Sequence, residues 1–367
     1  MVRHRSPVVA ACVAAALVSL VIAPAVGAAH PPIPGFDFTP PSFGLATAPD
    51  GGLLVADGGA GIVSLRKGSG AVIVDLPGVA DIAPIGRNRM FAISSIGDPA
   101  TEQPDSAWGF YVVGNGKAQK VADLLDFEKA HNPDGNTEPG GIDSNPFDVE
   151  ALTGSTALIA DAGGNDVLIA DRHGTLDWVA ALPQEVVSTA NAKSLFGCPT
   201  PPPGAEFVCQ LPPAMPAHPV ATSVAVGPDG AYYIGELKGF PGPLDASRIW
   251  RVAAGSRHVR CGTDPACTLV FDGGFTSIVD LKFGPDGTLY VTEIDEASSF
   301  AVEAEFFFGL PGLRQGGTVD ACDVTTRTCT ELATDLTVPI ATTIGKDGTV
   351  YALTEAVLPT AKVIALS

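Results

Sequence analysis

One short phrase recurs six times along the chain: an apolar run, a tight turn rich in Gly and Asp, and a second apolar run that ends at an acid or a hydroxyl. The clearest copies, at residues 45–57, 224–236, 281–293 and 342–354, read LATAPDGGLLVAD, VAVGPDGAYYIGE, LKFGPDGTLYVTE and TTIGKDGTVYALT. Residues 82–94 and 149–161 are degenerate copies. Because β-branched and aromatic residues fill the runs, each copy predicts two antiparallel strands joined by a tight turn.

Further strand-like runs follow most copies, which gives four strands per repeat. Six repeats of four strands predict an all-β fold, a six-bladed β-propeller with four-stranded antiparallel blades. The blades are expected at about residues 42–76, 79–124, 147–182, 221–272, 277–334 and 340–366. The last copy is followed by a single run, so a strand at about residues 34–39 is expected to complete the last blade and close the ring.

The first 29 residues have the features of a secretion signal, with basic residues before an apolar run and small residues at a cleavage site. We therefore expect the propeller to occupy residues 30–367 and to be secreted. After removal of the signal no segment is apolar enough to cross a membrane. The 40 acidic and 21 basic residues give a net charge of −19, which argues against nucleic-acid binding.

Six cysteines remain after the signal, in three pairs that are close in sequence. An oxidising compartment and this spacing predict three local disulfides, although the sequence alone leaves the connectivity open. A structural zinc site is disfavoured because there is no Cys-x-x-Cys and no histidine at ligand spacing beside a pair. The expected pairs are Cys198 with Cys209, Cys261 with Cys267, and Cys322 with Cys329.

The long segments between strands all fall on one face of the predicted propeller. They join the second strand of a blade to the third, or one blade to the next, and lie at residues 95–107, 126–146, 183–221, 237–247 and 294–316. Insertions in repeat proteins collect on the functional face, because loops carry function while the scaffold stays rigid. We call this face the loop face and expect it to bind the ligand.

The residue that ends the second strand of each repeat should lie on the rim of the loop face: Asp57, Ser94, Asp161, Glu236, Glu293 and Thr354. The start of the first strand points to the same rim and adds Asn145, Asp148, Glu150 and Asp280. Two interpretations stay open. The Asp residues accept hydrogen bonds from backbone N–H groups in the following turns, or several of these oxygens hold Ca²⁺ at the channel mouth.

His131 and His218 lie in the long segments, where each is either a general acid or base or an ordinary surface histidine. The chain has no Gly-x-Ser-x-Gly, no phosphate-binding loop and no His-Glu-x-x-His. The sequence therefore offers no motif that names a reaction.

The phrases at residues 144–152, 158–171, 232–241, 247–252 and 279–294 resemble the secreted ScyD/ScyE family, whose biochemical role is unassigned. More distantly, Asp161, Gly163, Gly164, Asn165 and Val167 are similar to the D-x-x-x-N signature of NHL-repeat propellers, which implies that Asp161 and Asn165 stabilise a turn. Calcium-dependent gluconolactonases and phosphotriesterase-like hydrolases share this architecture, and Asn145 falls where one of their metal ligands lies. Their Glu-Gly-Pro and later Asp-Gly ligand phrases are absent here.

These observations predict a binding protein without catalysis, a monomer that takes a small molecule or an extracellular protein on the loop face. The alternative is a metal-dependent hydrolase of lactones or phosphoesters. In that case Asn145, Asp161, Glu236 and Glu293 would hold a divalent ion that lowers the pKa of bound water.

Overall fold

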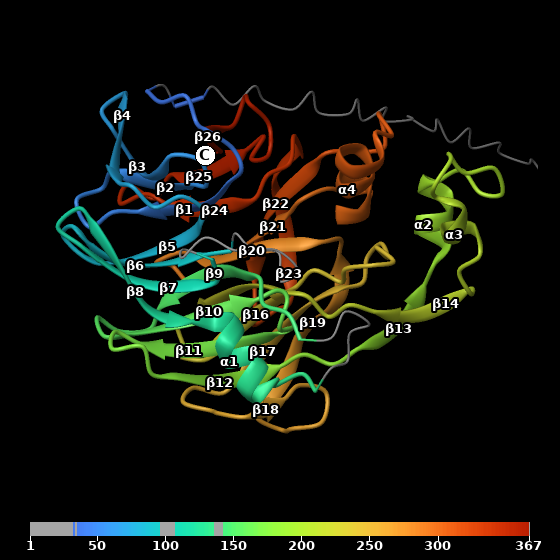
Figure 1. The fold of residues 1–367 in the computed structure, drawn as a ribbon, viewed down its shortest axis with the longest axis horizontal. Helices are drawn as coiled ribbons and strands as arrows, with labels where there is room; N and C mark the ends of the chain where they lie inside the picture. Colours follow the sequence, from blue (N-terminus) through green and yellow to red (C-terminus); the bar gives the residue numbers. More distant parts are fainter. Residues whose placement is uncertain (1–31, 34, 96–106, 136–141, 367) are drawn as a thin grey trace, which may run out of the picture.

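The computed structural model describes residues 32–33, 35–95, 107–135 and 142–366, which form a six-bladed β-propeller (Figure 1). The fold predicted from the repeats is confirmed. The signal at residues 1–29 and parts of the segments at 95–107 and 126–146 lie outside the described residues.

The blades are antiparallel sheets whose strands follow one another in chain order from the centre outward. Blades 1 and 2 consist of β1 (Ser42–Thr47), β2 (Leu53–Asp57), β3 (Gly61–Arg66) and β4 (Ser69–Val74), then β5 (Val79–Gly86), β6 (Arg89–Ser94), β7 (Gly109–Gly114) and β8 (Lys117–Asp123). Blades 3 and 4 consist of β9 (Pro146–Ala151), β10 (Thr156–Asp161), β11 (Asp166–Asp171) and β12 (Leu176–Ala181), then β15 (Ala221–Val226), β16 (Tyr232–Glu236), β17 (Ser247–Val252) and β19 (Cys267–Phe275). Blades 5 and 6 consist of β20 (Ile278–Phe283), β21 (Leu289–Glu293), β22 (Gly317–Asp323) and β23 (Thr328–Leu336), then β24 (Ala341–Ile344), β25 (Val350–Thr354) and β26 (Lys362–Ala365).

Blade 6 has three strands, and residues 32 and 33 pair with its outer edge. Pro32 bridges Ile364 in antiparallel fashion, and the Ile33 N–H donates to the Val363 carbonyl at 2.7 Å. The pairing lies just before the expected segment at 34–39, whose Phe38 packs instead into the apolar core between blades 6 and 1. Residues far apart in the sequence thus meet at the edge of blade 6.

Apolar side chains fill the spaces between neighbouring blades, with one core cluster at each junction. Blades 2 and 3, for example, bury Phe91 and Phe110, whose rings stack with centroids 5.3 Å apart. The second strands of the blades are buried along almost their whole length, because both faces of each blade pack against another blade.

Buried aspartates on the innermost strands tie successive blades together. Asp81 accepts from the Val149 N–H at 2.9 Å, Asp148 from the Val224 N–H at 2.6 Å, and Asp280 from the Thr342 N–H at 2.6 Å. Gly44 holds the matching place in blade 1, where a Cβ would lie 2.2 Å from the Asp81 Oδ1 atom. Asp148 and Asp280 therefore lie inside the ring, away from the loop-face rim where the sequence analysis placed them.

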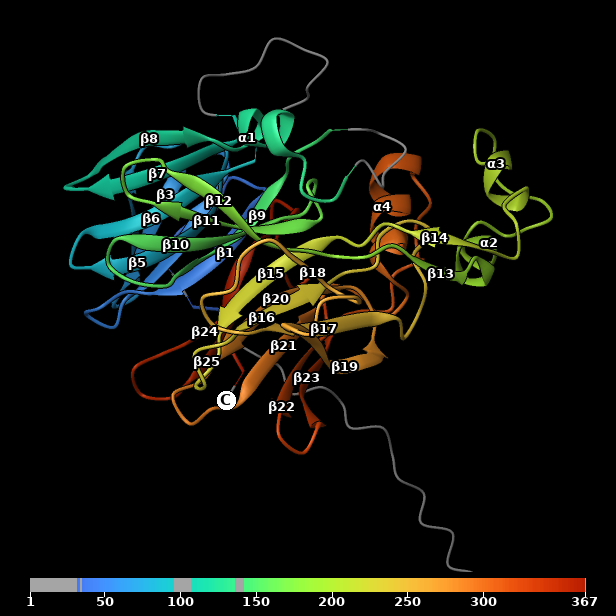
Figure 2. The same ribbon diagram turned by 90° about the horizontal axis from the view of Figure 1, so that it is seen from below.

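The insertions carry the helices. α1 (Leu124–His131) follows blade 2, and α4 (Ser299–Phe308) lies between β21 and β22. A two-stranded arm, β13 (Glu185–Ser188) and β14 (Ala214–Ala217), joins blades 3 and 4 and carries α2 (Ala190–Leu195) and α3 (Glu206–Cys209). The arm projects from the blades in both ribbon views (Figures 1 and 2). None of the helices in the described part of the chain is long and apolar enough to cross a membrane.

All three expected disulfides are present. Cys322–Cys329 links β22 to β23, and Cys198–Cys209 closes the segment that follows α2 and contains α3. Cys261–Cys267 anchors a loop whose short strand β18 (Val259–Arg260) pairs with β12, so this loop links blade 4 to blade 3. The three bridges fit an oxidising environment.

Candidate functional site

Three of the predicted rim residues serve the scaffold. Asp57 accepts from the backbone N–H groups of Thr39, Gly59 and Ala60 at 2.6 to 3.0 Å. Asp161 accepts from the Asn145, Gly163 and Gly164 N–H groups and from the Ser144 hydroxyl, at 2.5 to 3.1 Å. The Ser94 hydroxyl accepts from the Gly109 N–H at 3.0 Å. Each of these side chains holds the backbone of a connecting segment in place through hydrogen bonds.

Glu236 belongs to a buried charge network. Its carboxylate accepts from the Trp250 Nε1–H at 2.7 Å and from the Lys238 ammonium, which also pairs with Glu185. Burial raises the pKa of Glu236, while Lys238 opposes that shift. Lys238 is fully buried, and its charge is balanced by these two carboxylates.

Glu293 lies beside a second acid. It accepts from the Thr276 N–H and from the Thr318 hydroxyl, the latter at 3.3 Å. Burial raises the pKa of Glu293 to about 8, and the charge of neighbouring Asp320 contributes to the shift. A carboxyl group that keeps its proton at neutral pH can donate a hydrogen bond to its neighbour.

The other predicted residues are dispersed. Asn145 is exposed, Asn165 donates to Asp134 at 3.0 Å, and Thr354 is buried. The His131 ring stacks on Phe127 with centroids 4.3 Å apart, and the half-buried His218 lies near Phe240. Among the described residues, no three or more His, Cys, Asp and Glu side chains are arranged to hold a metal ion. Asp161, Glu236 and Glu293 thus do not share one ligand geometry.

A cleft of about 670 Å³ lies between the arm and blade 4, and we call it the arm cleft. The whole of β13 forms one wall, and the segment before β17 forms the other. Charged side chains line it: Glu185, Lys238, Asp245, Arg248 and Asp272, with Arg248 paired to both Glu185 and Asp272. Both walls belong to long insertions that the sequence analysis assigned to the loop face.

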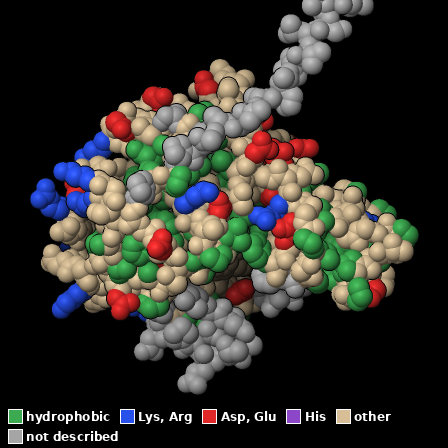
Figure 3. Space-filling model, turned by 90° about the horizontal axis from the view of Figure 1, so that it is seen from above, with side chains coloured by type: hydrophobic (Ala, Val, Ile, Leu, Met, Phe, Trp, Pro, Cys, Tyr) green, Lys and Arg blue, Asp and Glu red, His purple; other side chains and the backbone are tan. Residues whose placement is uncertain are grey.

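Contacts with neighbouring segments hold the arm in place. Asn191 on α2 donates to the carbonyls of Gly242 and Ala297 at 2.6 and 3.1 Å, which ties α2 to the segments that precede β17 and α4. Phe196 packs against Phe300 of α4 with ring centroids 5.2 Å apart. The arm forms the lobe at the right of Figure 3, where hydrophobic side chains are prominent and charged ones sparse. Its exposed apolar residues include Val186 and Phe207.

A smaller cleft of about 530 Å³ adjoins the arm cleft and shares Leu244, Asp245 and Gly273 with it. Its lining contains the Glu293 and Asp320 pair together with Glu296 and Glu331. Glu293, which ends β21, therefore lines the adjoining cleft, whereas Glu236, which ends β16, lies behind Lys238 of the arm cleft.

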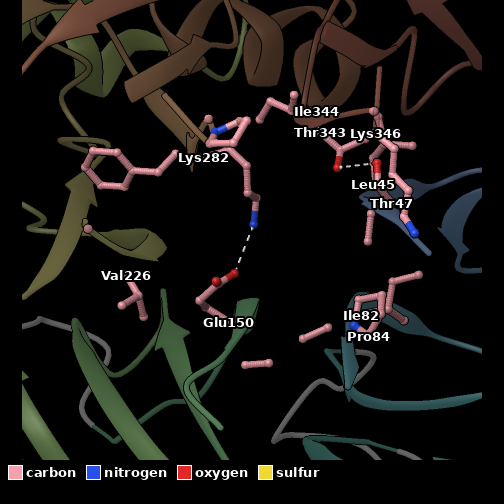
Figure 4. A pocket seen from close by; sticks show the side chains of 18 of the residues that line it. Leu45, Thr47, Ile82, Pro84, Glu150, Val226, Lys282, Thr343, Ile344 and Lys346 are labelled. Atoms are coloured by element: carbon pink, nitrogen blue, oxygen red, sulfur yellow. Dashed lines mark hydrogen bonds and ion pairs between the residues drawn. The ribbon is translucent and has the colours of Figure 1, made fainter. Parts of the chain in front are cut away.

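The central channel opens on the opposite face, among the short turns, into a cavity of about 740 Å³ lined by all six blades. Lys282 points into it and pairs with Glu150 at 3.3 Å, as Figure 4 shows. The charges of Glu150, Asp148, Asp280 and Asp81 keep the pKa of Lys282 well above its ordinary value, against the effect of burial. Glu150, predicted at the loop-face rim, thus lines the opposite end of the channel.

Comparison with known proteins yields no match to a protein-family model and none to a curated protein. Solved structures of similar fold include a gluconolactonase from Xanthomonas campestris, with 11% identity, a TM-score of 0.53, and coverage of 90% of this chain and 88% of that one. A glucose dehydrogenase-type oxidoreductase from Thermus thermophilus has 14% identity, a TM-score of 0.51, and coverage of 91% and 98%. The PQQ domain of a pyranose dehydrogenase from Coprinopsis cinerea has 12% identity, a TM-score of 0.50, and coverage of 91% and 94%. At such identities the likeness shows the propeller fold alone.

Proposed function

We propose that this chain is a secreted binding protein of the ScyD/ScyE type, and that it binds an extended peptide segment of another extracellular protein along β13 in the arm cleft. The observation that carries the proposal is the open edge of β13. Among the described strands β13 pairs only with β14, so its other edge presents unpaired backbone groups to a partner strand.

The register of the arm indicates which groups are available. Val186 lies opposite Pro216, which has no N–H to donate. The two residues therefore form a non-hydrogen-bonded pair, and the N–H and C=O of Val186 point away from β14. Ser188, two residues further on, points its backbone groups in the same direction. Val186 is 70% exposed, so a bound peptide would also cover an apolar side chain.

The arm that forms this cleft is not required to close the ring of blades. The ring closes through its inner strands and interblade cores, whereas the arm stands outside them. Charged groups at the cleft floor, of both signs, would select among peptide side chains while the β13 edge supplies main-chain hydrogen bonds. An acidic protein with exposed apolar residues at one cleft fits a protein partner better than a nucleic acid.

The test is selection from a random linear-peptide library on the immobilised chain, followed by affinity measurements on variants. Val186→Pro removes the outward N–H and should weaken a selected peptide by roughly tenfold or more, the effect of about 1.4 kcal/mol. Val186→Ala keeps the N–H and is the matched control, with a smaller change expected. Equal binding by the proline variant, or no selected peptide at all, contradicts the proposal.

The hydrolase alternative has one specific observation in its favour. Glu293, protonated up to about pH 8, lies beside Asp320 in the adjoining cleft, and two carboxyls of different pKa can act as acid and base. The gluconolactonase of similar fold supports a lactone as the substrate class of this alternative. Turnover of lactone or phosphotriester substrates that is lost in Glu293→Gln would favour it over peptide binding.

A further inference from the structure

A buried pair of carboxylates lies away from both clefts and from the channel, between α1 and blade 3. Glu128 on α1 and Asp166 on β11 are 1% and 0% exposed. Among the described residues, Glu128 Oε1 and both carboxylate oxygens of Asp166 have no hydrogen-bond donor when both groups are ionised, and the two carboxyls lie within hydrogen-bonding reach of each other. Buried carboxylates without donors are costly, so the native protein requires something to compensate them.

Further acidic residues surround this pair and make the local charge more negative. Asp161 and Asp134 lie close enough to act electrostatically on both acids, and Asp143 acts on Glu128. Asp161 is itself satisfied by four donors, and Asp134 accepts from Asn165. The nearest basic side chain on α1, Lys129, is exposed and pairs with Asp126. Glu128 and Asp166 therefore lie together without a basic counter-charge among the described side chains.

Both carboxylates converge on one small space, which Gly164 leaves open. A Cβ at Gly164 would lie 3.1 Å from Glu128 Oε1 and 3.3 Å from Asp166 Oδ1. The phrase Asp-Ala-Gly-Gly-Asn-Asp at residues 161–166 thus places two glycines and an acid beside Glu128 of α1. Oxygen donors around such a space suit a hard cation, which completes its coordination with backbone or amide oxygens and water.

We propose that Glu128 and Asp166 bind a divalent cation of the calcium or magnesium class, in a site that fastens α1 to blade 3. Two carboxylates match the charge of one divalent ion. The proposed site uses neither Asn145 nor the rim glutamates, and it acts on structure and not on a substrate. It is independent of peptide binding at the arm cleft.

The proposal is tested on the full chain, first treated with a chelator and then titrated with Ca²⁺ or Mg²⁺ alone. Calorimetry should show one bound ion, and the melting temperature should rise on its addition. Asp166→Asn and Gly164→Ala should abolish this rise, because one removes a ligand and the other fills the space. Asp126→Asn, which removes an exposed carboxylate from the same helix, should retain it.

Glu128→Gln separates a cation from a shared proton. The amide can donate to Asp166, so this variant should melt above the metal-free parent and show no further rise with Ca²⁺. If the two acids only share a proton, neither ion will shift the melting temperature of the unaltered chain. That result, or a shift that persists in Asp166→Asn, would overturn the proposal.

Discussion

Glu293 retains its proton at neutral pH because it is buried beside Asp320. Its folded pKa of about 8 lies above the ordinary value of 4.5, so the folded state binds the proton more tightly than the unfolded state. The resulting stability is fully present below about pH 4.5 and is lost as the pH rises through about 8. The protein should therefore unfold more easily at pH 8 than at pH 5.

Glu293→Gln should flatten this dependence, since the amide can donate to Asp320 at any pH. The free energy of unfolding should change less between pH 4.5 and 8, by at most about 1.4 kcal/mol per pH unit. Denaturant melts across this range provide the measurement, with the exposed Glu331→Gln of the same cleft as the control. An unchanged slope in Glu293→Gln would show that Glu293 titrates normally.

Single residues were the hardest to predict from the sequence. The repeat register places Asp57, Asp161, Glu236 and Glu293 correctly at the ends of their strands, because strand ends follow from the turn signals. Their partners depend on segments distant in sequence, such as Thr39 for Asp57. Lys238 and Asp166 gave no signal, since their significance arises from burial, which a single sequence does not reveal.

Among the elements, the pairing of the N-terminal segment with β26 has the clearest energetic consequence. A chain that begins at residue 34 lacks the Ile33 donor to Val363 and exposes the edge of β26. Relative to a chain that begins at residue 32, its free energy of unfolding should be lower by about 1 kcal/mol or more. Copies of it should also associate with one another through the open edge. Calorimetry and light scattering test this, and identical behaviour of the two chains would show that the pairing does not stabilise the ring.

The strands were predictable because apolar runs and Gly-Asp turns repeat with the period of a blade. The arm was not. Residues 183–221 read as a long loop, since α2 and α3 are short and prolines surround them. Their stability comes from the Cys198–Cys209 bridge and from packing of Phe196 on α4, which are tertiary effects.

At the scale of the whole molecule, the two faces of the propeller carry different structures. The short turns surround the channel cavity at one end, and the insertions form the arm cleft and the adjoining cleft at the other. The acids of the channel bond to backbone groups of the next blade, which assigns them to ring closure. Binding at the arm cleft should therefore leave the ring unchanged.

Hydrogen exchange of the full chain, with and without a selected peptide, tests this claim most directly. The outward amides of Val186 and Ser188 on β13 should exchange more slowly with the peptide bound, while the strands that line the channel, β20 among them, keep their rates. Slower exchange around Lys282, with β13 unchanged, would place the binding site at the other end of the molecule and contradict the account.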